Sequence, residues 1–191
     1  MSYFVPTPDE LRRIALEEFA HGGYLGTSLQ RIAEAAGTSK SSVLYHYASK
    51  ETLLEAAIDP TLDAFERLVD RIEAGELEGE LRGAFIAEFV DLLLEHRLQV
   101  HLFINQGRSL EDVPVIVRGN ALIERIGTYF HTAAAGLDDA IRFGVALGGA
   151  AYSLVAAPPV AEQVPPDEIR AALIRIVTEL LTPARLRPTS P

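Results

Sequence analysis

Residues 26–54 read GTSLQRIAEAAGTSKSSVLYHYASKETLL, and this stretch decides the fold of the chain. Thr27 and, three residues later, Gln30 have the spacing of a capping box, which predicts that a helix begins here. The apolar residues that follow recur at i, i+3, i+4 and i+7: Leu29, Ile32, Ala33 and Ala36. This period is typical of a short amphipathic helix.

A second short helix is predicted directly after a glycine turn. Gly37 stands where a helix end favours a left-handed residue, and Thr38 or Ser39 can cap the next helix. The expected inward side of that helix consists of Val43, Leu44 and Tyr47. Two short helices joined by about four residues that include a glycine have the spacing of a DNA-binding helix-turn-helix, whose second helix lies in the major groove.

The polar side of the second predicted helix carries hydrogen-bond donors: Lys40, Ser41, Ser42, Tyr45 and His46. All of them can donate to phosphate oxygens, and all except His46 can also reach base edges. No acidic residue lies between Gly37 and Lys50, and Lys40 and Lys50 are the only lysines of the chain. This selective placement of positive charge indicates a polyanion as partner, although a plain helical hairpin with a solvated face is the alternative.

Residues 27–53 match without a gap the pattern T-[ST]-x-x-x-I-A-x-x-A-G-[VT]-S-x-x-x-[LV]-x-x-[HY]-[FY]-x-S-K-E-x-L. With this pattern the chain resembles the TetR family of transcriptional repressors. The resemblance implies that four residues contact phosphates: Thr27, Ser28, His46 and Lys50. It implies that five residues face the groove: Ser39, Lys40, Ser41, Ser42 and Tyr45.

One position departs from the family pattern. Leu44 stands where the family usually has a tyrosine, and Tyr45 follows it. Either Tyr45 takes over the phosphate contact of the missing tyrosine, or that contact is absent.

Charge is distributed unevenly along the 191 residues, whose net charge is −10. Residues 1–56 hold five basic and seven acidic side chains, and residues 57–191 hold twelve and twenty. An acidic protein repels DNA, so we expect weak non-specific binding and strong dependence on a fitted site.

Composition excludes several kinds of site. The chain has no cysteine, hence no disulfide framework and no thiolate metal site. Its five histidines are scattered, and H-E-x-x-H, G-x-S-x-G and phosphate-cradling glycine motifs are absent. We therefore expect no enzyme activity, no metal and no cofactor. The N-terminal residues do not have the pattern of a signal peptide, which predicts a cytoplasmic protein.

Helical periodicity extends over the rest of the chain and predicts an all-α fold of about nine helices. Pro60 is expected to kink a long helix that starts at Ser49, and a further helical stretch bends or restarts around His96 and Arg97. We divide the chain into three parts: a helix-turn-helix DNA-binding domain at 1–48, an effector-binding and dimerisation domain at 49–182, and a disordered tail at 183–191.

The stretch 143–161 is uncharged and, on length alone, long enough for a membrane span. Two consecutive prolines shorten its helical part, which is rich in glycine and alanine, so a helix buried among other helices fits better. The TetR resemblance implies that the last two helices, expected at 139–157 and 167–182, form a homodimer. The predicted interface residues are Gly144, Gly148, Tyr152, Leu173, Ile176 and Leu180.

Aromatic and polar residues mix between positions 60 and 135, as a small-molecule cavity requires. The candidate effector-binding residues are Phe65, Phe89, His101, Phe103, Asn105 and Arg108. Arg108 would bind a carboxylate or carbonyl of a hydrophobic effector. The resemblance therefore favours a repressor that an effector releases from a near-palindromic operator, and the alternative is a dimeric DNA-binding or scaffold protein without an effector.

Overall fold

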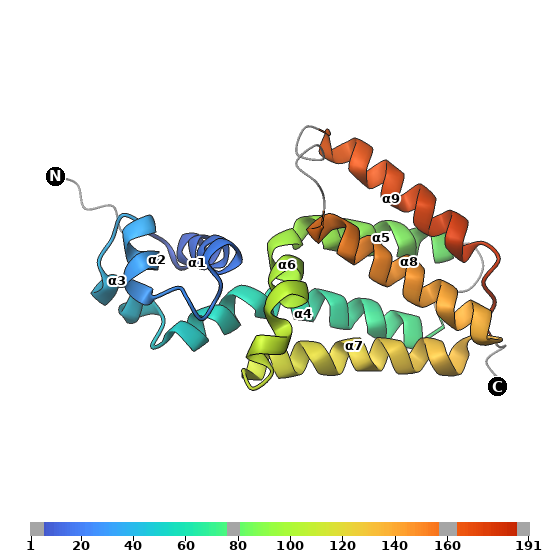
Figure 1. Ribbon diagram of the computed structural model, residues 1–191, viewed down its shortest axis with the longest axis horizontal. Helices are drawn as coiled ribbons and strands as arrows, with labels where there is room; N and C mark the ends of the chain where they lie inside the picture. The colour runs from blue at the N-terminus through green and yellow to red at the C-terminus, as the bar shows by residue number, and fades with distance from the viewer. Residues whose placement is uncertain (1–5, 76–80, 157–163, 187–191) are drawn as a thin grey trace.

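The computed structural model describes residues 6–75, 81–156 and 164–186. Within these ranges the chain forms nine α-helices, one short 3₁₀ helix and no strand, which confirms the all-α prediction. A small N-terminal unit lies at one end of an elongated molecule, and α4 runs from it into a larger helical body (Figure 1).

The N-terminal head consists of α1 (Pro8–Gly22), α2 (Leu29–Ala35) and α3 (Lys40–His46). Thr7 caps α1: the Glu10 amide donates to Thr7 Oγ1 at 3.2 Å, and the Thr7 amide donates to Glu10 Oε2 at 2.7 Å. This reciprocal capping box satisfies two of the amides that a helix start leaves without partners.

The cap of α2 differs from the prediction by one residue. Ser28, and not Thr27, is the N-cap, since its Oγ accepts from the Arg31 amide at 3.2 Å. Thr27 is only 2% exposed. Between α2 and α3, Gly37 has φ +64°, the left-handed conformation that favours glycine, and Ser39 then caps α3.

Helix α4 (Lys50–Glu73) begins at the N-cap Ser49 and continues through Pro60. The buried core does not break at the predicted boundary after residue 48. One cluster of buried residues joins Leu11 of α1 and Ile32 of α2 with Leu54 of α4 and Ile116 of the body. The head and the body therefore share part of their core.

The body contains α5 (Leu81–Glu95), α6 (Arg97–Gln106), a 3₁₀ turn (Gly107–Leu110), α7 (Pro114–Ala133), α8 (Leu137–Val155) and α9 (Pro166–Leu181). The helix break at His96 agrees with the sequence prediction. Helix α8 starts earlier than expected, so Asp138 lies in its first turn. There the positive end of the helix dipole stabilises its carboxylate.

Two arginines fasten α7 to α4. Arg118 donates to Asp59, Asp63 and Glu66 of α4, with separations between 2.6 and 3.0 Å. Seven residues further along the same face, Arg125 donates to two more carboxylates of α4, Asp70 and Glu73. The acidic residues on one face of α4 thus pair with the arginines of α7.

The prediction of a disordered tail is wrong for residues 183–186. Ala184 is 3% exposed, and the Ala135 amide donates to the Arg185 carbonyl at 3.0 Å. Arg82 of α5 donates to the carbonyls of Leu181 and Ala184, both at 2.9 Å. The loop after α7 and the start of α5 therefore hold these residues. The remaining predicted tail, 187–191, lies outside the described residues.

No helix in the described part of the chain is long and apolar enough to cross a membrane.

Candidate functional site

The outward face of α3 is formed by Lys40, Ser41, Leu44 and Tyr45, all of which are exposed. Tyr45 is 85% exposed and Leu44 is 41% exposed, whereas Val43 is fully buried beneath them. The prediction that Leu44 packs inward is therefore wrong. Because α3 has only two turns, Val43 is enough to anchor it to the head core, and Leu44 is left on the outer surface.

Tyr47, which follows α3, closes the head. It is buried, and its hydroxyl donates to the Pro8 carbonyl at 3.0 Å. This hydrogen bond links the end of α3 to the start of α1. The family pattern allows phenylalanine or tyrosine at this position, and the hydroxyl group that only tyrosine carries is hydrogen-bonded here.

Lys40 is the one basic side chain of residues 6–56 for which the structure shows no partner. The three arginines of the head each pair with a carboxylate: Arg12 with Asp9, Arg13 with Glu17 and Arg31 with Glu18. Positive charge available to a ligand is thus concentrated at the first residue of α3.

Lys50 does not point outward as a free phosphate contact. Its Nζ donates to the carbonyls of Tyr24 at 2.7 Å and Thr27 at 2.9 Å, and it lies 4.2 Å from the centre of the Tyr24 ring. Burial lowers the pKa of Lys50. In this structure Lys50 ties α4 to the turn between α1 and α2.

The other predicted DNA contacts fall into two groups. Thr27 is buried and its hydroxyl donates to the Glu18 carbonyl at 3.1 Å, so its side chain does not face a DNA phosphate in this structure. Ser28 and Ser39 are exposed, but each also caps a helix. Ser42 and His46 are partly buried at the edge of the α3 face, with the His46 ring edge-on to Tyr45.

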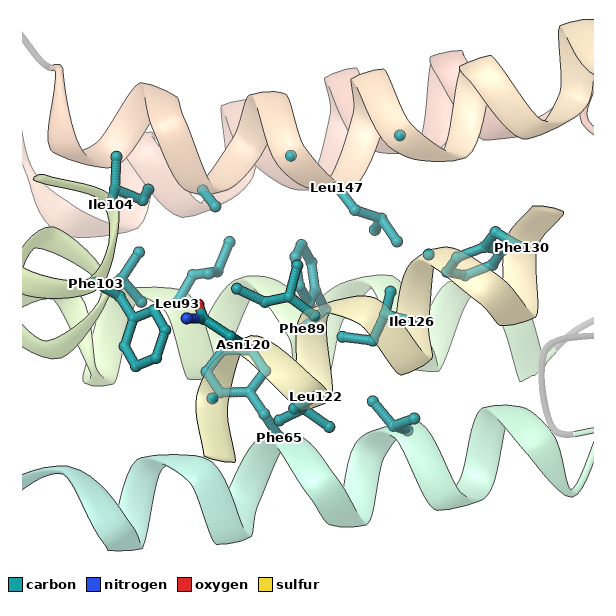
Figure 2. A pocket seen from close by; sticks show the side chains of 18 of the residues that line it. Phe65, Phe89, Leu93, Phe103, Ile104, Asn120, Leu122, Ile126, Phe130 and Leu147 are labelled. Carbon is teal, nitrogen blue, oxygen red and sulfur yellow. The ribbon is translucent and has the colours of Figure 1, made fainter. Parts of the chain in front are cut away.

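The body contains a cavity of about 1000 Å³ between α4, α5, α6, α7 and α8, partly open to solvent. Its wall is mostly aliphatic and aromatic, and Figure 2 shows side chains from several helices converging on it. Four of the predicted effector residues line the cavity: Phe65, Phe89, Phe103 and Arg108. Phe89 stands between two other rings, stacked with Phe85 and edge-on to Phe65.

Two predicted effector residues lie away from the cavity. His101 and Asn105 do not line the cavity, and they bond to one another at 3.3 Å. Four residues apart on α6, they share a face of that helix that turns away from the cavity. Periodicity identified α6 but not which of its faces turns inward.

Asn120 is a cavity residue that the sequence prediction missed. It lies on α7 among apolar wall residues, and its side chain projects into the cavity (Figure 2). Arg118 lies two residues before Asn120 and Glu124 four residues after it, so the sequence offers no reason to single out this polar residue. Gln99 and Thr61 also line the cavity, and Thr61 Oγ1 lies 3.0 Å from His96 Nδ1. Within the described residues no group of acids and histidines can hold a metal ion.

The predicted dimer residues occupy several environments. Gly144, Gly148 and Tyr152 border the cavity. Leu173 and Leu180 pack against the core of their own chain, and Ile176 is 48% exposed. Tyr152 is 61% exposed, and Val145 of the same helix, which was not among the predicted residues, is 54% exposed.

Comparison with known proteins agrees with this geometry. Residues 11–57 match the family model for bacterial regulatory proteins of the tetR family. The transcriptional repressor KstR2 of Mycolicibacterium smegmatis is 32% identical over 111 residues, which cover 56% of this chain and 52% of KstR2. The regulator RutR of Escherichia coli is 47% identical over 49 residues, covering 26% of this chain and 23% of RutR. The KstR2 match thus spans about half the length of that relative.

Solved structures share the fold over nearly the whole chain. The ketosteroid transcriptional regulator KstR2 of Mycobacterium tuberculosis superposes with a TM-score of 0.73 at 18% identity, covering 93% of this chain and 94% of that one. A TerR/AcrR-family regulator from Aquifex aeolicus gives 0.63 at 19% identity, with coverages of 92% and 99%.

Proposed function

Because the chain belongs to the TetR family of bacterial regulatory proteins, we propose that it is a sequence-specific repressor of transcription that a hydrophobic small molecule releases from DNA. The observation that carries the proposal is the outward face of α3, which combines the unpaired Lys40 with the exposed Tyr45. A helix that presents such donors can enter the major groove and reach base edges.

In this proposal the face of α3 reads the DNA bases and its edges bind the backbone. Lys40, Ser41 and Tyr45 face the groove, with Ser39 and Ser42 beside them, while Ser28 and His46 contact phosphates. Lys50 and Thr27 act indirectly, because their polar atoms are bonded within the head. The protein itself carries a net charge of −10, so specific contacts must outweigh long-range repulsion.

Selection of duplexes from a random-sequence pool tests the proposal. We expect enrichment of a near-palindromic site whose half-sites lie roughly 34 Å apart or slightly more. Lys40→Ala should flatten the slope of log K against log salt by about one unit, the consequence of one lost phosphate contact, or relax base preference if Lys40 reads a base. Lys50→Met should lower stability and leave the slope unchanged. No enrichment by the wild-type protein would refute DNA recognition.

The cavity supports an apolar effector of substantial size. A cavity of about 1000 Å³ with a wall of aromatic and aliphatic side chains favours a polycyclic or long-chain molecule. Asn120 can bond to one of its polar groups, and Arg108, which also lines the cavity, can bond to a carboxylate or carbonyl. KstR2, whose fold the chain shares, is a ketosteroid regulator, which agrees with this size class.

A neutral fluorescent probe, N-phenyl-1-naphthylamine, tests for the effector site. We expect it to bind the wild-type protein and Asn105→Ala, whose substitution lies outside the cavity, more tightly than Ile126→Trp, whose larger side chain narrows the cavity. Equal binding by Ile126→Trp would contradict a ligand site here and would favour a DNA-binding dimer without an effector.

A homodimer through α8 and α9 completes the proposal. Gly149 faces outward, since a Cβ added to it would meet no other atom within 4 Å, and Val145 and Ile176 add exposed apolar surface. Gly149→Glu should shift the protein to a monomer in sedimentation at micromolar concentration, because it buries an unpaired charge in the contact. Gly83→Glu, equally unhindered but on α5, is the matched control.

A further inference from the structure

The end of α6 is bonded directly to the head. Gln106 is the last residue of α6, and its side-chain Oε1 accepts from the Tyr24 amide at 2.7 Å. Its Nε2 donates to the Phe19 carbonyl at 2.8 Å. Both partners lie more than 80 residues earlier in the chain, at the end of α1 and in the turn that leads to α2. One side chain thus spans the junction between body and head.

The same turn of α6 forms part of the cavity wall. Phe103, one turn before Gln106, lines the cavity, as do Ile104 and Gly107 on either side of it. The Phe103 ring lies against the backbone of Gly119 so closely that a Cβ added there would be 2.0 Å from the ring carbon Cζ. An occupant that displaces Phe103 would therefore act on a side chain one turn before Gln106.

In the head, Gln106 and Lys50 both bond to Tyr24. The amide of Tyr24 bonds to Gln106 and its carbonyl bonds to Lys50, which also holds the Thr27 carbonyl. The next residue, Ser28, is the N-cap of α2. The turn before the helix-turn-helix is thus held from α6 on one side and from α4 on the other.

We propose that Gln106 is a positioning residue that couples the occupancy of the cavity to the placement of α2 and α3 on DNA, by a route separate from the length of α4. The inference rests on the proposed function. With the cavity empty, Gln106 holds the turn; an occupant that shifts Phe103 weakens both bonds and releases it. A ligand changes DNA affinity only through such a difference between two states.

Gly119→Ala imitates an occupant without requiring its identity, because the added methyl group must displace the Phe103 ring. We expect it to lower affinity for the selected duplex about tenfold when Gln106 is present, a typical coupling between sites. In a Gln106→Met background, which lacks both bonds, the same substitution should change affinity less than about twofold. Asn105→Ala, adjacent to Gln106 but bonded only to His101, should leave the tenfold effect intact.

Two results would overturn the coupling role: an equal effect of Gly119→Ala with and without Gln106, or no effect with Gln106 present. Failure of the wild-type protein to bind any duplex would instead refute the proposed function. Hydrogen exchange of the Tyr24 amide gives a measurement without DNA. Gly119→Ala should speed exchange at Tyr24 while exchange in α9 stays unchanged, and unchanged exchange at Tyr24 would also contradict the proposal.

Discussion

Packing differs between the two ends of α4. Near its start, Leu53 and Leu54 are fully buried in the head core, whereas further along Phe65, Leu68 and Ile72 line the cavity of the body. Protein interiors are normally close-packed, and a space of this size forfeits contacts between the side chains around it. Helix α4 therefore joins a tightly packed head, suited to hold α3 in a fixed orientation, with a body that contains a cavity. The packing of that body can change when a molecule occupies the cavity.

The largest predicted effect contrasts two isoleucines. Ile32 is fully buried in the head, and Ile126 lines the cavity. Ile32→Ala should lower the free energy of unfolding by about 2–5 kcal/mol, the usual cost of a new cavity in a packed core. Ile126→Ala should cost clearly less, because its side chain already borders empty space. Urea unfolding of both variants measures the difference, and equal losses would mean that the cavity wall is as tightly packed as the head.

The next effect concerns the attachment of the cavity wall. Arg118→Gln removes bonds to Asp59, Asp63 and Glu66 and leaves these carboxylates facing one another. We expect a loss of about 1 kcal/mol at low salt, since the site is partly exposed and solvent screens it. The loss should shrink in 1 M salt, where the Debye length is about 3 Å.

Arg67→Gln is the matched control, since Arg67 is exposed on α4, the helix that carries the carboxylate partners of Arg118, and has no ion pair in the described residues. If Arg67→Gln and Arg118→Gln gave the same loss, the link between α4 and α7 would not depend on this arginine.

The difference between head and body also explains which predictions held. The head is built from neighbouring residues, so the turn at Gly37 and the burial of Val43 follow from short spacings. Leu44 was misplaced because its helix is too short for periodicity to separate a second buried position. The sequence contains no signal for the hydrogen bonds of Lys50, because its partners, the carbonyls in the turn before α2, are backbone atoms that no side-chain pattern reveals.

The cavity was harder to predict, because its wall comes from five helices. Aromatic content located Phe65, Phe89 and Phe103, but the orientation of α6 depends on contacts with distant helices, and this excluded His101. Gln106, with partners more than 80 residues away, has no local signal at all.

A smaller predicted effect tests the role of Leu44, which stands where the TetR pattern usually has tyrosine. An exposed leucine between Lys40 and Tyr45 offers an apolar contact to a thymine methyl group in the major groove. Replacing the contacted thymine by deoxyuridine should weaken wild-type binding by about 0.8 kcal/mol, the value of one buried methylene-sized group. Leu44→Ala should bind both duplexes equally. If Leu44→Ala retained the full preference for thymine, another residue would make the contact.

The smallest predicted effect is a dependence of stability on pH that originates in the body. Burial lowers the pKa of His96 below its usual 6.5, while the neighbouring Glu95 acts in the opposite direction. The folded protein therefore binds this proton more weakly than the unfolded chain, so the stabilisation is complete above pH 6.5 and is lost as the pH falls through the folded pKa. His96→Gln should flatten the dependence of the free energy of unfolding on pH over this interval, as measured by urea unfolding. A slope that survives in His96→Gln would assign the titration to another group.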